Sequence, residues 1–98
     1  MSNPRKWLTS KDPELARAAR RYEKRCRAAA NSPRRRALLD ERTHAVAEVL
    51  LRLYGPQASE PDAWALFVRH YTAPFTLTLE ERDRVEAMGA RLLMTHRA

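Results

Sequence analysis

The residues with the clearest chemistry are nine arginines and lysines between Arg17 and Arg36, in a segment with a single acid, Glu23. Guanidinium groups form paired hydrogen bonds with phosphate and carboxylate oxygens, so this density of arginine favours contact with a polyanion. Residues 1–36 hold 12 basic and 3 acidic side chains, a net charge of +9, whereas residues 37–98 hold 7 and 9, a net charge of −2. Such asymmetry is typical of proteins that bind nucleic acid or an anionic membrane surface.

The spacing of these residues predicts that they share one side of a helix. With residues placed about 100° apart, Leu15, Tyr22, Cys26 and the alanines form a narrow apolar seam, and basic residues cover much of the remainder. We therefore expect an outward-facing stripe that binds the phosphate backbone of DNA or RNA rather than reading bases. The residues expected to make these contacts are Arg5, Lys6, Arg17, Arg20, Arg21, Lys24, Arg25, Arg27, Arg34, Arg35 and Arg36.

Two other kinds of partner could bind this basic helix. A membrane surface is a poor fit, because the apolar seam is mostly alanine and offers little area for insertion. An acidic protein, or a second copy of the chain, is the alternative, with the protein acting as an adaptor or inhibitor. Leu66, Phe75 and Met94, which we expect to be exposed, leave room for such an assembly.

Residues that suit catalysis or metal binding are sparse. Asp40, His44 and Glu48 follow one another at four-residue intervals, but no second histidine accompanies them, and a solvated polar face explains them. The chain has no glycine-rich phosphate loop and no nucleophile–base motif. We expect a protein without enzymatic activity, and without a metal, a cofactor or a small-molecule substrate.

Cellular location is predicted from three negative features. The single cysteine, Cys26, excludes a disulfide within the chain and fits a reducing compartment. No apolar run approaches the ~20 residues needed to span a bilayer, and the N-terminus lacks the apolar core of a secretory signal. These features together predict a cytoplasmic protein.

The elements that must position the basic residues are helices. Ala, Leu, Arg and Glu are frequent in the 98 residues, and there are only two glycines, so the composition favours a single all-α domain. Residues 1–11 are predicted to form a short basic arm and residues 12–98 the domain. Its helices are expected over about 13–30, 33–54, 60–72 and 79–96.

Capping residues set these boundaries. A capping side chain followed by proline occurs at Asp12-Pro13 and again at Ser32-Pro33, and Gly55-Pro56 ends the second helix. Ser59 and Thr78 each precede an acid by three residues, which is typical of a capping box. Each predicted helix therefore begins at a recognisable cap.

The lengths of the connections suggest how the helices pack. Only Asn31-Ser32 separates the first two helices, which predicts an antiparallel hairpin. The helix over 33–54 is apolar around most of its circumference, so we expect other elements on several of its sides. The predicted architecture is a small four-helix bundle-like domain built on that hairpin.

Overall fold

The computed structural model describes residues 13–29, 32–71 and 75–95, and its regular elements over these residues are all helices. In chain order they are α2 (Pro13–Arg20), α3 (Glu23–Ala28), α4 (Pro33–Tyr54), α5 (Glu60–His70) and α6 (Leu79–Leu93). The prediction of an all-α protein is confirmed. None of these helices is both long and apolar enough to cross a membrane.

The predicted caps of the last three helices are confirmed. The Ser32 and Ser59 side chains accept hydrogen bonds from the amides of Arg35 and Asp62, at the starts of α4 and α5. At the start of α6, the Glu81 amide donates to Thr78 Oγ1 at 3.1 Å and the Thr78 amide donates to Glu81 Oε1 at 2.9 Å. This reciprocal pair is a complete capping box, which satisfies two amides that lack partners within the helix.

The ends of two helices differ from the prediction, because α5 stops at His70 and α6 at Leu93. After α6 the chain becomes extended and pairs with the α4–α5 connection. The Gln57 amide donates to the Leu93 carbonyl at 2.7 Å, and the Thr95 amide donates to the Gln57 carbonyl at 2.8 Å. This pairing with a distant segment supplies the hydrogen bonds that a further helical turn would have supplied.

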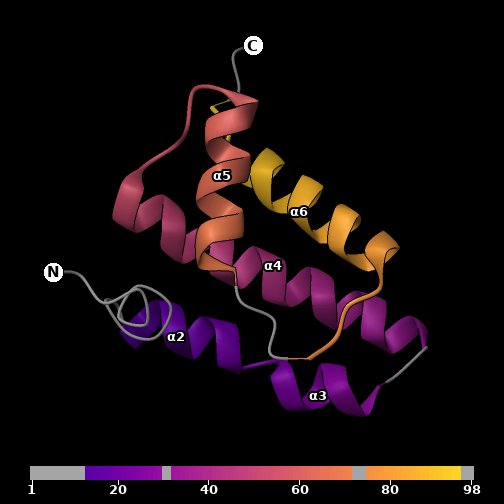
Figure 1. Cartoon of the computed structure of the whole chain (residues 1–98). Coiled ribbons are helices and arrows are strands. Elements are labelled where there is room, and N and C mark those ends of the chain that lie inside the picture. Colours follow the sequence, from indigo (N-terminus) through magenta and orange to yellow (C-terminus); the bar gives the residue numbers. More distant parts are fainter. Residues whose placement is uncertain (1–12, 30–31, 72–74, 96–98) are drawn as a thin grey trace, which may run out of the picture.

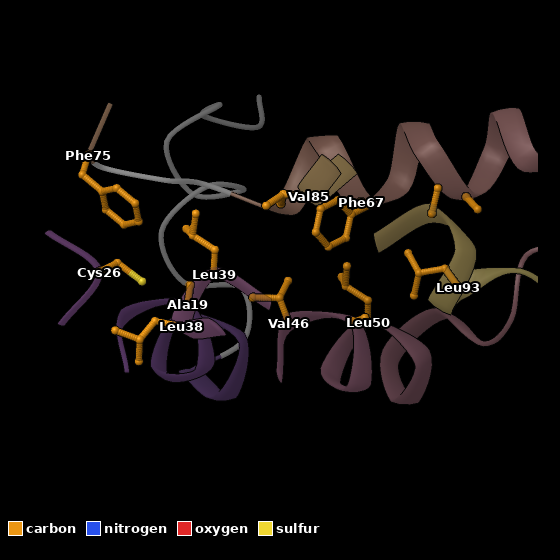
Figure 2. Packing of buried hydrophobic residues seen from close by; sticks show 13 residues of the cluster. Ala19, Cys26, Leu38, Leu39, Val46, Leu50, Phe67, Phe75, Val85 and Leu93 are labelled. Atoms are coloured by element: carbon orange, nitrogen blue, oxygen red, sulfur yellow. The ribbon is translucent and has the colours of Figure 1, made fainter. Parts of the chain in front are cut away.

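The helix α4 lies between the other elements, with α2 and α3 on one side of it and α5 and α6 on the other (Figure 1). It contacts α2, α3 and α6, and α5 packs mainly on α6. Leu39, Val46 and Leu50 of α4 are fully buried and lie along the middle of the core (Figure 2). The expectation that residues 33–54 are packed on several sides is therefore confirmed.

The predicted continuous helix over 13–30 is wrong, because a turn at Arg21 and Tyr22 divides it into α2 and α3. At this break the Nε of Arg42, from α4, donates to the Ala19 carbonyl at 2.7 Å. In a continuous helix that carbonyl would accept from the amide of Glu23. A side chain inserted into the helical hydrogen-bond ladder is a known cause of a helix kink.

Contacts between residues 13–28 and α4 occur in reverse order along the two segments. Glu14, near the start of α2, pairs with Arg52, near the end of α4. Further along, Arg42 contacts the backbone of Ala19, and Arg35 contacts that of Cys26. The two segments therefore run in opposite directions.

The apolar residues expected at the surface are mostly covered. Phe75 is buried, and Leu66 and Met94 are half-buried against the core, so the prediction that these three are exposed is wrong. Conversely, Val68 of α5 and Leu79 of α6 are exposed. Helical spacing identified the core face of residues 13–28, but it did not indicate which side chains of the later helices their neighbours cover.

Candidate nucleic-acid interface

A group of exposed cations covers the outer side of α2, the turn that follows, α3 and the first turn of α4. Residues 17, 20 and 21 are spaced three and four apart on and just after α2, which places them on one side. We call this group the basic surface. It consists of Arg17, Arg20, Arg21, Lys24, Arg25, Arg27, Arg34 and Arg36, and all eight are exposed.

The acids of the same segment do not neutralise the basic surface. Within residues 13–36 the only acids are Glu14 and Glu23. Glu14 pairs with Arg52, and a Glu23 carboxylate oxygen lies 3.8 Å from Arg42 Nη2, so both acids pair with arginines of α4. None of the eight cations forms an ion pair with any residue that the structure describes.

Arg35 was predicted to contact phosphate, but its guanidinium is committed within the protein. Its Nε and Nη2 donate to the two carboxylate oxygens of Glu81 at 2.7 and 3.3 Å. It also donates to the carbonyls of Cys26 and Thr76 at 3.3 and 3.0 Å, and it lies over the Phe75 ring. We therefore exclude Arg35 from the basic surface, because a phosphate would have to displace these partners.

The contact between Arg35 and Glu81 changes the proton affinity of both side chains. Its hydrogen bond to Arg35 holds the pKa of Glu81 below its usual range, and burial opposes this only in part. The same hydrogen bond raises the pKa of Arg35. Both groups are therefore charged at neutral pH, and the pair links the start of α4 to the start of α6.

Sequence reasoning missed Arg42, which is fully buried and is the largest fully buried side chain of the described residues. Besides contacting Ala19 and Glu23, its guanidinium lies 4.4 Å from the centroid of the Tyr71 ring. The sequence does contain an indication that Arg42 is buried. Position 42 lies three and four residues from Leu39 and Val46, so it belongs to the apolar face of the helix.

The other candidate residues are explained without a ligand. Asp40 pairs with Arg84, while His44 is exposed with its Nδ1 2.8 Å from the backbone oxygen of Asp40. No group of three metal-ligating side chains occurs among the residues with described positions. Cys26 is buried, and burial raises the pKa of its thiol despite the opposing charges of Arg42 and Arg35.

Two predicted contact residues, Arg5 and Lys6, lie in the arm over 1–11 and outside the described residues. Of the other nine, eight form the basic surface and one, Arg35, supports the fold. Comparison of the chain with protein families, with curated proteins and with solved structures found no match.

Proposed function

We propose that this protein binds nucleic acid through contacts between the basic surface and the phosphate backbone, as a single protein or as a subunit of a nucleoprotein complex. The observation that carries the proposal is a set of eight exposed cations that form no ion pair with a described residue, beside two acids that are paired elsewhere. Seven of the eight are arginines, whose planar fork suits paired hydrogen bonds with phosphate oxygens.

Repulsion within the basic surface supports a polyanionic partner. Arg17 and Arg21 are four residues apart and joined by a helical hydrogen bond of 3.0 Å, so their charges lie close together. Each such like-charged pair destabilises a helix by a few tenths of a kcal/mol. Arg34 and Arg36 lie in the first turn of α4, where cations oppose the helix dipole. Phosphate groups would relieve both effects.

The arrangement of the helices that carry the basic surface is part of the proposed function. The antiparallel pairing of residues 13–28 with α4 forms the platform, within a four-helix bundle-like domain, and the arm over 1–11 adds Arg5 and Lys6. Nothing in this mechanism needs a catalytic group, a metal or a cofactor. The protein acts in the cytoplasm by binding alone.

The salt dependence of binding tests the proposal. The full chain is titrated against labelled DNA and RNA by fluorescence anisotropy at several salt concentrations. If about five phosphates are neutralised on a duplex, log K should fall with log salt at a slope of about −4.5. Replacing Arg20, Arg21, Lys24 and Arg25 with alanine should abolish binding and leave the thermal midpoint unchanged or raised.

A matched pair of double variants tests whether binding depends on the basic surface in particular or on the net positive charge of the protein in general. R20A/K24A and R82A/R91A remove the same charge, but Arg82 and Arg91 are exposed on α6 and not on the elements that carry the basic surface. Only R20A/K24A should reduce the salt slope, by about 1.8 for two lost phosphate contacts. Failure of the chain to bind any nucleic acid at low salt would favour the acidic protein partner instead.

A further inference from the structure

The basic surface offers positive charge but no exposed aromatic face. Among residues 13–36 the only aromatic residue is Tyr22. Tyr22 is half-buried against the core, and the Arg21 guanidinium lies 5.5 Å from the centroid of its ring. Proteins that bind single strands combine a basic groove with aromatic side chains on which successive bases stack. Over the described residues, this surface has the charge without a stacking platform.

The eight cations of the same surface are hydrogen-bond donors and not acceptors. Ser32 and Tyr22 carry the hydroxyl side chains of the described residues up to 36, and Ser32 Oγ both donates to the Ala29 carbonyl at 2.8 Å and accepts from the Arg35 amide. The two carboxylates, Glu14 and Glu23, pair with arginines of α4. A protein distinguishes RNA from DNA through the ribose 2′-hydroxyl, which both donates and accepts. None of the eight side chains of the basic surface can accept that hydroxyl's proton.

We propose that the partner of the basic surface is double-stranded DNA, held along its phosphates with little dependence on base sequence. This inference rests on the proposed function and narrows it to one kind of nucleic acid. A surface whose side chains only donate hydrogen bonds and carry positive charge suits phosphate oxygens. Phosphate contacts fix the position of a protein on the duplex but carry no sequence information. Duplex DNA carries about one negative charge per 1.7 Å of helix axis and releases more counterions per contact than a single strand does.

The helical form of the surface also favours DNA over an RNA duplex. The cations lie on two short helices, α2 and α3, and on the start of α4. The major groove of B-form DNA is wide enough to admit an α-helix, with phosphates on both of its walls. The major groove of A-form RNA is deep and narrow, and side chains do not reach into it. Helix-borne arginines therefore reach more phosphates on DNA.

Competition between nucleic acids of equal length tests this inference. The full chain, bound to a labelled DNA duplex of mixed sequence, is challenged with four unlabelled competitors: the same duplex, one of its strands, the RNA duplex of the same sequence, and a DNA duplex of different base composition. We expect the two DNA duplexes to compete within about twofold of each other. The single strand and the RNA duplex should compete about tenfold more weakly, since fewer phosphates are reached.

The outcomes distinguish this inference from the proposed function. A single strand or an RNA duplex that competes as well as duplex DNA overturns the choice of DNA, although the protein remains a nucleic-acid-binding protein. A preference of tenfold or more for one DNA sequence overturns recognition by phosphates alone. As a control, R82A/R91A should keep the order of the competitors, whereas R20A/K24A should weaken binding to duplex DNA at least tenfold.

Discussion

The two sides of α4 are held in different ways. On one side, α2 and α3 are joined to α4 by arginine side chains, with Arg42 contacting Ala19 and Glu23. On the other side, α6 is also joined to α4 by two ion pairs, Arg35–Glu81 and Asp40–Arg84. The packing of α5 on α6 is apolar, and Phe67 of α5 lies so close to α6 that glycine is needed at position 89. The basic segment depends on polar contacts for its placement, because its seam of small residues buries little apolar area.

Net charge therefore does not reveal which arginines are available to a partner. In the sequence Arg35 lies between two exposed residues, Arg34 and Arg36, yet of these three only Arg35 binds internal groups among the described residues. Arg42 is completely enclosed and holds the turn between α2 and α3. The same residue type contributes to the outer surface in one place and to internal support in another.

Removal of Arg42 should have the largest effect, on the side held by polar contacts. Arg42→Ala leaves a large cavity and frees the Ala19 carbonyl and the Glu23 carboxylate. We expect the free energy of unfolding to fall by about 3–5 kcal/mol. Urea denaturation followed by circular dichroism measures this loss. Arg52→Ala is the control, because Arg52 is exposed and its pair with Glu14 should contribute less than about 1 kcal/mol. Equal losses in the two variants would contradict the internal function of Arg42.

Gly89→Ala tests the side held by apolar packing. The added Cβ would overlap the ring of Phe67, which is fully buried and has little room to move. Overpacking of this kind destabilises a protein by about 1–3 kcal/mol, partly offset by the better helix propensity of alanine. Gly55→Ala is the comparison, because nothing lies near its Cβ and only the φ of +76° resists the change. If Gly89→Ala unfolds at the wild-type urea midpoint, the close packing of α5 on α6 is refuted.

Replacement of Arg35 should reduce the stability of the fold, whereas replacement of its neighbours Arg34 and Arg36 should not. Arg35→Ala removes two hydrogen bonds to Glu81 and two to backbone carbonyls, so we expect a loss of about 1–2 kcal/mol. Arg34→Ala and Arg36→Ala should change stability by less than about 0.5 kcal/mol and weaken DNA binding instead. Measuring the denaturation midpoint and the DNA affinity for all three variants tests this division directly. A stable Arg35→Ala with weakened binding would place Arg35 on the basic surface after all.

Acid should weaken the contact between α4 and α6. The folded pKa of Glu81 is below its unfolded value, so its contribution to stability is complete above the unfolded pKa of about 4.3. That contribution is lost as the pH falls through the lower, folded pKa. Thermal midpoints of the wild type and Glu81→Gln, measured from pH 7 downwards, should therefore converge in acid. A constant difference between them would mean that the Glu81 charge contributes nothing.

Much of the secondary structure was predictable, because its signals are local. The side chains of Ser32, Ser59 and Thr78 accept hydrogen bonds from backbone amides at the starts of helices, and Gly55 ends α4 with a positive φ. These residues act on backbone groups within a few positions of themselves, so their effect is visible in the sequence. The break at Arg21 and Tyr22 has no such local cause, since the side chain at that point comes from α4.

The sequence predicted that the basic surface is rich in arginine and lysine, but it did not predict which of these residues belong to it. Periodicity indicated which side of residues 13–28 faces outwards, and eight of the nine predicted basic residues between 17 and 36 are exposed and form no ion pair within the described part of the chain. The exclusion of Arg35 depends on Glu81, 46 positions away. No pattern within the N-terminal segment could have indicated that partner.

Local signals in the amino-acid sequence specify a helical chain, the residues at which most of its helices begin, and the concentration of positive charge in its first third. Tertiary contacts are needed to establish which arginines point inwards, where the first helical segment bends, and which apolar side chains are covered. The two kinds of interaction differ in how far they reach along the chain. Caps and helical periods act within about four residues, whereas ion pairs and packing join residues that are far apart in the chain.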